Sequence, residues 1–438
     1  MDPSEKSPNR IENKEKYTGR QLVMLSNTSG FSDIRKKAGT ASLRLAPSGD
    51  YQKDGNAYKK AFSEADGIVF ERLGVAVINP HHEEQINELR SAARTQNTFV
   101  YSEPERYLYA LDGQGYAETN RWRNLWDAVC QIFKPSPARR PDTGLFDFDD
   151  DSTASWGIHA LRILDTRFTG KGVNIAILDT GFNLGHPDFA DRVIKSESFI
   201  EGEKVEDLNG HGTHCTGIAA GSSNKSSGVR YGVAKEANIY IGKVLSNQGS
   251  GSDSSILAGI EWALTNKCQV ISMSLGAAVS LGETYSNIYN DIGKLAMAQG
   301  TIIIAAAGNE SNRNMGVISP VGHPANCPSI MAVGALNSKM DVANFSCGGL
   351  NPNGGQVDVG APGVAVYSAY KSPDNYGIIS GTSMATPYVA GIAALYYEEK
   401  PESSASEIWM KITQNARRLD LPATDVGAGL VQPVLQQT

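Results

Sequence analysis

Four short apolar segments, separated by stretches with helical periodicity, constrain the fold more than any other feature of this 438-residue chain. They are residues 173–178, 239–244, 270–275 and 301–307. Nearly continuous apolar runs of this length are typical of parallel strands that are buried on both faces. Helical patterns lie between them at 254–265 and 288–298. The sequence therefore predicts an α/β domain with a doubly wound, mostly parallel sheet over residues 153–438.

The residues before this domain follow a different pattern. Residues 1–20 are polar and charged, which predicts a disordered tail. Residues 21–111 contain a short amphipathic helix at 82–92, and the β-prone runs around it predict a small α+β ferredoxin-like domain. Those runs are 21–26, 67–78 and 99–111. The pattern of residues 112–152 predicts a connector with a short amphipathic helix. The acidic end of this connector is either a solvated linker or a regulatory segment that is cut during activation.

The composition excludes several classes of partner. Hydrophobic residues make up 40% of the chain and charged residues 20%, which are ordinary values for a globular protein. The formal net charge is -7 and implies no basic face, so we expect no nucleic acid partner. No uninterrupted apolar run is long enough to cross a membrane, so we expect no membrane partner.

The cysteines and the N-terminus bear on location. The five cysteines are widely spaced and form no CxxC pair, which argues against a disulfide framework and fits a reducing compartment. The first twenty residues lack the apolar stretch of a secretory signal. We therefore expect a cytoplasmic location, and the alternative is export by a route that this sequence does not show.

Two motifs place an acid and a base where catalysis would need them. Asp179 in AILDTG ends an apolar run, at the sheet edge where open parallel sheets hold ligands, and an aspartate there can fix the tautomer of an imidazole. His211 in NGHGTHCTGIAAG begins a helix whose small residues permit the close packing that a general base requires. Taken singly, the first is more simply a helix cap and the second a surface or core histidine. His211 and His214 also match a weak HxxH metal pair, but no third ligand stands at a helpful spacing.

Two further motifs supply a nucleophile and an amide donor. Ser383 in GTSMATPYVAGIAAL lies at the start of a long apolar helix, where free backbone N–H groups favour the negative charge that develops on an attacked carbonyl oxygen. Asn309 in AAAGNES follows a strand, and its side chain can donate to an oxyanion. Alone, the first is an ordinary N-cap serine and the second a turn residue. All four motifs occur in one domain, in the order Asp, His, Asn, Ser.

These motifs resemble those of the subtilisin-like serine peptidases, in which the triad follows the order Asp, His, Ser. AILDTG, NGHGTH, AAAGNE and GTSMATP match the family almost letter for letter, and the resemblance covers about residues 153–436. It implies that Asp179 orients the base and that His211 is the base. It also implies that Ser383 is the nucleophile and that Asn309 stabilises the oxyanion. No cofactor is expected for catalysis.

The resemblance also implies how substrate binds. The family binds substrate as an added β-strand, here between 249–252 and 274–276. The primary pocket would be walled by 305–308, with Gly322 near its base, and such small walls suit a large apolar side chain before the cut. Asp253, near a more distant pocket, is either an exposed acid or a residue that favours a basic side chain. The residues expected to contact substrate are Gly249, Ser250, Gly251, Ser274, Leu275, Gly276, Ala306, Gly308 and Gly322.

Residues 21–111 resemble the inhibitor-like propeptide of this family in element order and in the ending FVYSEPERYLYAL. This implies that the ending lies in the active cleft like a product and that the chain cuts itself after or near Leu111. The family often holds structural calcium. Asp188 matches one ligand and Asn224 is a second candidate, although the loop GSSNKSSGVRYG departs from the usual pattern. Cys215 resembles the cysteine near the histidine in the proteinase K branch, although a small buried packing residue explains it as well.

The predicted function is a serine endopeptidase that hydrolyses peptide bonds through an acyl-enzyme and is made as a self-processing zymogen. Its partners would be protein or peptide substrates and its own propeptide as inhibitor. One rival is a peptide ligase on the same scaffold, but nothing in the sequence signals a dedicated cap over the site. The other is a permanently inhibited binding protein, and the complete set of catalytic residues argues against it.

Overall fold

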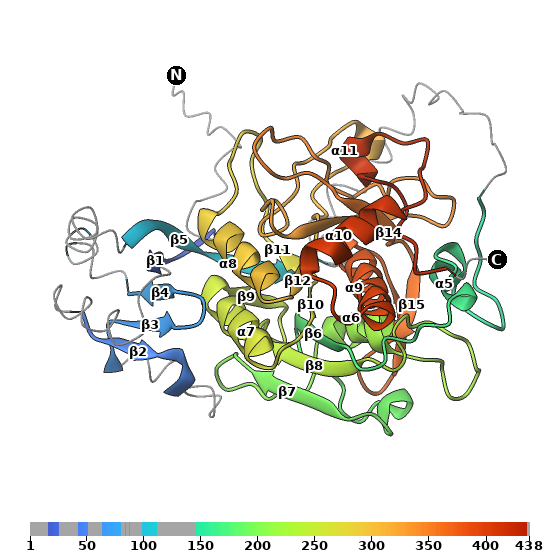
Figure 1. Cartoon of the computed structure of the whole chain (residues 1–438), viewed down its shortest axis with the longest axis horizontal. Helices are drawn as coiled ribbons and strands as arrows, with labels where there is room; N and C mark the ends of the chain where they lie inside the picture. Colours follow the sequence, from blue (N-terminus) through green and yellow to red (C-terminus); the bar gives the residue numbers. More distant parts are fainter. Residues whose placement is uncertain are drawn as a thin grey trace, which may run out of the picture.

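The fold is given by a computed structural model, which describes residues 16–25, 43–50, 64–79, 84, 87, 99–111 and 146–435. A large α/β domain and a small β-sheet lie side by side, and the small sheet packs beside helices α7 and α8 (Figure 1). Among the described residues, none of the helices has the combined length and apolar character that crossing a bilayer requires.

The large domain is built on seven parallel strands. In sheet order they are β14 (Val359–Pro362), β13 (Met331–Leu336), β12 (Ile302–Ala306), β10 (Val270–Met273), β6 (Asn174–Asp179), β8 (Asn238–Lys243) and β7 (Ile194–Ser198). The central strands are buried along almost their whole length, because helices cover both faces. This confirms the doubly wound α/β fold, and the four predicted apolar strands differ from the observed ones by only a few residues at their ends. A separate hairpin joins β15 (Val366–Ala369) and β16 (Tyr376–Ile379).

Alternate side chains of the sheet enter two different cores. Ile175 and Ile177 of β6 pack in the core formed with α6 and α9, whereas Ala176 and Leu178 pack in the core formed with α7 and α8. The helices are α5 (Trp156–Ala160), α6 (His211–Ala220), α7 (Asp253–Thr265), α8 (Asn287–Ala298), α9 (Thr382–Glu399), α10 (Ala405–Gln414) and α11 (Ala423–Val426). Short 3-10 helices lie at Ser48–Asp50, Ile163–Asp165, Pro187–Phe189 and Arg313–Met315.

The small sheet contains β1 (Tyr17–Leu25), β2 (Leu45–Pro47), β3 (Gly67–Phe70), β4 (Val75–Ile78) and β5 (Phe99–Ala110). Its order is β5-β1-β4-β3-β2, and β4 lies antiparallel between β1 and β3, as in a split βαβ arrangement. The run predicted at 67–78 forms the two-stranded hairpin that a ferredoxin-like element order requires, and Gly74 adopts a φ of 68° at its turn. One prediction needs correction. Residues 17–20 belong to β1 rather than to the tail predicted for 1–20. The helix predicted at 82–92 lies almost entirely outside the described residues.

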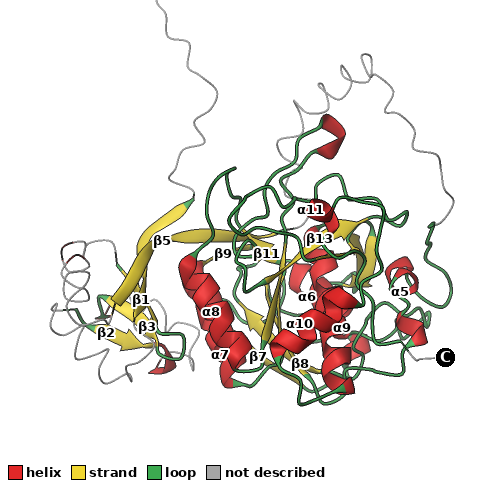
Figure 2. Ribbon diagram, turned by 45° about the horizontal axis from the view of Figure 1, so that its top comes forward, coloured by secondary structure: helices red, strands yellow, loops and turns green. Residues whose placement is uncertain are grey.

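β5 connects the two parts of the molecule. It pairs with β1 of the small sheet and continues along the large domain, where it pairs with β9 (Ser250–Ser252) and β11 (Leu275–Gly276) (Figure 2). The amphipathic helix predicted in the connector 112–152 lies outside the described residues. The end of that segment is not a free linker, because Phe146 and Phe148 pack against the main core of the large domain.

Candidate active site

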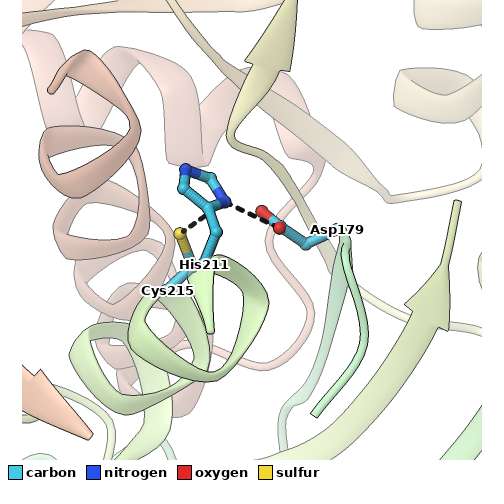
Figure 3. A group of neighbouring side chains, drawn as sticks. All are labelled: Asp179, His211 and Cys215. Atoms are coloured by element: carbon cyan, nitrogen blue, oxygen red, sulfur yellow. Dashed lines mark hydrogen bonds and ion pairs between the residues drawn. The ribbon is translucent and has the colours of Figure 1, made fainter. Parts of the chain in front are cut away.

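Asp179 and His211 form a buried hydrogen-bonded pair at the carboxyl edge of the large sheet. Asp179 is the last residue of β6, and His211 is the first residue of α6. The Nδ1 atom of His211 lies 2.7 Å from Oδ1 of Asp179, and both side chains are buried (Figure 3). α6 begins this close to the strand because Gly212 has no side chain: a Cβ atom there would come 2.4 Å from the carbonyl oxygen of Gly181.

The pair prepares the imidazole to act as a base. Burial disfavours the imidazolium, but the nearby Asp179 carboxylate outweighs it and raises the pKa of His211 well above 6.5. Because Nδ1–H donates to Asp179, Nε2 carries the free lone pair. Nε2 has no hydrogen-bond partner among the residues that the structure describes, so it is available to take a proton.

Ser383 lies in the first turn of α9 and is buried, and its backbone carbonyl oxygen lies 3.5 Å from Sγ of Cys215, a neighbour of His211. Its hydroxyl donates to the carbonyl oxygen of Ser274, at 3.0 Å, and not to His211 as the triad would require during attack. Rotation about the Cα–Cβ bond of Ser383 is the movement that frees this hydroxyl. Catalytic hydrogen bonds often form only when the reacting complex is assembled, so the arrangement is compatible with a resting site.

Asn309 already holds a peptide carbonyl group. Its Nδ2 donates to the carbonyl oxygen of Leu111 at 2.6 Å, directly after β5. Its Oδ1 accepts hydrogen bonds from the backbone N–H and the hydroxyl of Thr382, at 2.9 and 2.8 Å. These two bonds fix the orientation of the amide, so the Leu111 carbonyl oxygen lies where an oxyanion would be stabilised.

β5 occupies the place predicted for a substrate strand. It lies antiparallel to β9 on one side, with Leu108 opposite Gly251, and to β11 on the other, with Ala110 opposite Leu275. Two bonds extend these ladders: the N–H of Ala110 donates to Gly249 O at 2.8 Å, and the N–H of Leu111 donates to Ser274 O at 3.4 Å. The predicted strand residues Gly249, Ser250, Gly251, Ser274, Leu275 and Gly276 all lie along β5.

The side chain of Leu111 is buried against small residues. A Cβ atom on Gly276 would come 2.8 Å from the carbonyl oxygen of His323 and 3.1 Å from Cδ1 of Leu111, so only glycine leaves room there. At Gly322, a Cβ atom would approach the carbonyl oxygen of Ala277 to 2.9 Å. Ala306 ends β12, and Gly308 follows it with a φ of 115°.

Cys215 and His214 follow His211 in α6, and both are buried. Sγ of Cys215 lies 3.9 Å from Nδ1 of His211 and is buried, as expected of a packing residue. Asp179, His211 and Cys215 are the one group of three ligand-type side chains that lie close together within the described residues, and the first two are hydrogen-bonded to each other. Nε2 of His214 donates to Val366 O, and burial lowers the pKa of His214 to about 3, so it is a neutral structural residue.

Asp188, the expected calcium ligand, is surrounded by protein donors. Its Oδ1 accepts hydrogen bonds from the N–H of Lys225 at 2.9 Å and the hydroxyl of Tyr376 at 3.0 Å. Its Oδ2 accepts one from the hydroxyl of Tyr231 at 2.7 Å. Calcium is bound by about six to eight oxygen ligands, whereas both oxygens of this carboxylate already accept hydrogen bonds from protein N–H and O–H groups. Asn224 likewise directs its Oδ1 to two backbone N–H groups, so these residues do not fit a calcium ion.

We therefore expect chelation to leave this part of the fold intact. In a catalytically inactive background, EDTA should change the Tm by no more than about 1–2 °C. Tyr231→Phe should cost about 1–3 kcal/mol of stability, because Oδ2 of the buried Asp188 loses a donor. Differential scanning calorimetry measures both effects, and Tyr107→Phe, at an exposed hydroxyl-bearing position, is the control. A large drop in Tm with EDTA, restored by calcium, would contradict this assignment.

Comparison with known proteins agrees with this geometry. The model of the subtilase family (Peptidase S8) matches residues 170–430, which is more than half of the chain. Subtilisin DY from Bacillus licheniformis is 40% identical over 60% of this chain and 90% of its own length. Subtilisin E from Bacillus subtilis is 41% identical over 58% of this chain and 62% of its own length. A thermostable alkaline protease from Halalkalibacterium halodurans is 38% identical over 64% and 72%. The chain belongs to the subtilase family and is a subtilisin-like serine endopeptidase, which needs no cofactor for catalysis.

Proposed function

We propose that this endopeptidase is made as a self-processing zymogen, in which residues 17–111 inhibit the site until the bond after Leu111 is cut. The observation that carries the proposal is the Leu111 carbonyl oxygen, held by Asn309 at the end of a strand that fills the cleft. A strand in this position is a substrate before the bond is cleaved and a bound product afterwards.

The proposed reaction at this bond assigns a role to each of these side chains. Oγ of Ser383 attacks the carbonyl carbon while Nε2 of His211 takes its proton, and Asp179 stabilises the imidazolium. The Asn309 amide and the N–H of Ser383 stabilise the oxyanion. The C–N bond then breaks, and the proton passes from Nε2 to the leaving amine. Water repeats the sequence on the acyl-enzyme and regenerates the free hydroxyl.

Carboxylates of β5 support the inhibitory role by binding the starts of two helices of the large domain. Oε1 of Glu103 accepts hydrogen bonds from the N–H groups of Asn287 and Ile288, at the start of α8. Oε1 of Glu105 accepts one from the N–H of Ser254, in the first turn of α7, at 3.0 Å. A negative charge at a helix N-terminus is stabilising, so these contacts hold β5 in the cleft.

The small sheet makes a further contact with α7. Glu261, in the middle of that helix, accepts a hydrogen bond from the N–H of Arg72 at 2.8 Å and another from the hydroxyl of Ser48. Side chains of the small sheet and of α7 and α8 also belong to one hydrophobic core. Both features support tight binding of the small domain as an intramolecular inhibitor.

The alternation of buried and exposed side chains along β5 supports a preference for large apolar side chains before the cut. Leu111 and Leu108 are buried against the large domain, whereas Tyr107 and Tyr109 are 39% and 46% exposed. Substrates bound in the same register would present their first and fourth residues before the cut to the enzyme, and these positions would be apolar.

Self-cleavage tests the proposal. The purified full chain, incubated and analysed by intact mass spectrometry, should yield a fragment ending at Leu111. Leu111→Asp should slow this cleavage at least 100-fold, because the buried position would receive a charge that lacks a partner. Tyr109→Asp places the same charge at a half-exposed position and should slow cleavage far less. Cleavage at other positions only, or an equal effect of the two variants, would contradict it.

A further inference from the structure

Arg106 lies directly beyond the part of β5 that pairs with the large domain. The ladder with β9 covers residues 107–109, so Arg106 is the sixth residue before the proposed cut. It faces the large domain like Leu108, since only 9% of Arg106 is exposed while Tyr107 between them is 39% exposed. A basic residue is thus packed into the cleft at a position where substrate would also pass.

The partner of Arg106 is Asp253, the first residue of α7. Oδ2 of Asp253 accepts a hydrogen bond from the backbone N–H of Arg106 at 2.7 Å and lies 3.9 Å from the guanidinium Nη1 atom. The same Nη1 atom lies 3.5 Å from a carboxylate oxygen of Glu103, which belongs to β5 itself. Asp253 is fully buried, so the prediction of an exposed acid was wrong.

The large domain itself offers Asp253 an uncharged partner. Its ion-pair partners among the described residues are Arg106 and His323, whose Nε2 lies 3.4 Å from Oδ1. Burial, followed by the charge of Arg106, lowers the pKa of His323, so its imidazole is neutral near pH 7. When β5 leaves, the carboxylate loses the cation of Arg106, while the imidazole of His323 remains beside it. A substrate strand in the place of β5 would bury the carboxylate again, and because a buried charge without a countercharge is costly, a strand that brings a cation is favoured.

We propose that Asp253 selects substrates with arginine or lysine at the sixth position before the cut. This inference rests on the proposed function, because it assumes that substrate binds in the same position and register as β5. Two interactions would act together: the carboxylate accepts the substrate backbone N–H, which any residue can donate, and it attracts the side-chain cation. The second interaction gives specificity, because the pair is shielded from water and a neutral side chain leaves the charge uncompensated.

Peptides that copy the end of β5 separate the two interactions. One peptide carries RYLYAL before the cut, and its match replaces the arginine with citrulline, which has the same shape and no charge. The self-processed enzyme should hydrolyse the arginine peptide with a kcat/KM about 10-fold higher. Asp253→Asn keeps an acceptor for the backbone N–H but removes the charge, so it should reduce this ratio to about 1. Glu402→Gln, at an exposed acid, should keep the ratio of the wild type.

Each outcome decides between the possibilities. Equal hydrolysis of both peptides by the wild type would overturn the inference and leave Asp253 as an acceptor for any backbone, while the endopeptidase activity stands. The same ratio in Asp253→Asn as in the wild type would overturn it as well. The wild-type comparison is decisive even if the variant does not fold. Failure to cut either peptide would contradict the proposed function, and this inference with it.

Discussion

Ser383→Ala is expected to stop self-cleavage after Leu111 and to lower the turnover of casein by about a million-fold, the size of loss known for the nucleophile of a subtilisin. The physical reason is that Oγ of Ser383 is the nucleophile of the proposed reaction, and alanine leaves no hydroxyl at that position. The chain should therefore accumulate at its full 46.9 kDa. Gel electrophoresis over a day and release of labelled casein peptides measure the two effects.

A matched serine controls for the loss of a hydroxyl near the site. Ser380 lies three residues earlier, and its Oγ accepts a hydrogen bond from the N–H of Ala365 at the surface hairpin. Ser380→Ala should retain turnover within a few-fold of the wild type. Normal cleavage by Ser383→Ala would show that another residue is the nucleophile, and the assignment of the triad would be wrong.

Asp179→Asn is expected to lower kcat by about 10,000-fold. The amide preserves the shape of the side chain but removes the charge that holds Nδ1–H in place and stabilises the imidazolium. Because the Asp179 charge raises the pKa of His211, the variant should have a lower histidine pKa. Activity is lost on the acid side when the base becomes protonated, so the acid limb of the kcat/KM profile should shift to lower pH.

The pH profile distinguishes a catalytic role from a structural one. A variant that is merely misfolded would lose activity equally at all pH values, with no shift of the acid limb. Asp165→Asn, at a carboxylate that is half exposed on the surface, should keep both the rate and the profile. An unshifted acid limb in Asp179→Asn would contradict the proposed electrostatic role of the carboxylate.

The sequence predicted the parts of the site that depend on local pattern. Asp179 ends a buried strand and His211 begins a helix of small residues, so their place at one sheet edge follows from topology. Residues 67–78 supply the two adjacent strands that a ferredoxin-like element order needs, and their turn lies around Gly74, which interrupts an otherwise continuous apolar run.

Contacts between distant segments could not be predicted. Glu103 binds the start of α8, which is more than 180 residues away, and nothing in its neighbourhood distinguishes it from an exposed acid. The burial of Asp253 depends on β5 in the same way. The hydrogen bond from Ser383 to Ser274 could not be predicted from the sequence either, because it depends on the side-chain rotamer of Ser383 and not on its position in the fold.

The membership of β5 in two sheets has a consequence for timing. If the bond after Leu111 is cut, the new carboxyl end stays bound, because β5 still pairs with β9 and β11. The other half of β5 pairs with β1 of the small sheet. Departure of that strand then requires the small sheet to come apart or to leave as a whole, and its apolar face is shared with α7 and α8. The lag between the first cut and full activity would be set by the unfolding rate of about ninety residues that never touch the chemistry. Substitutions in that remote core, such as at Phe70, would shorten or lengthen the lag without altering the speed of the enzyme once it is free.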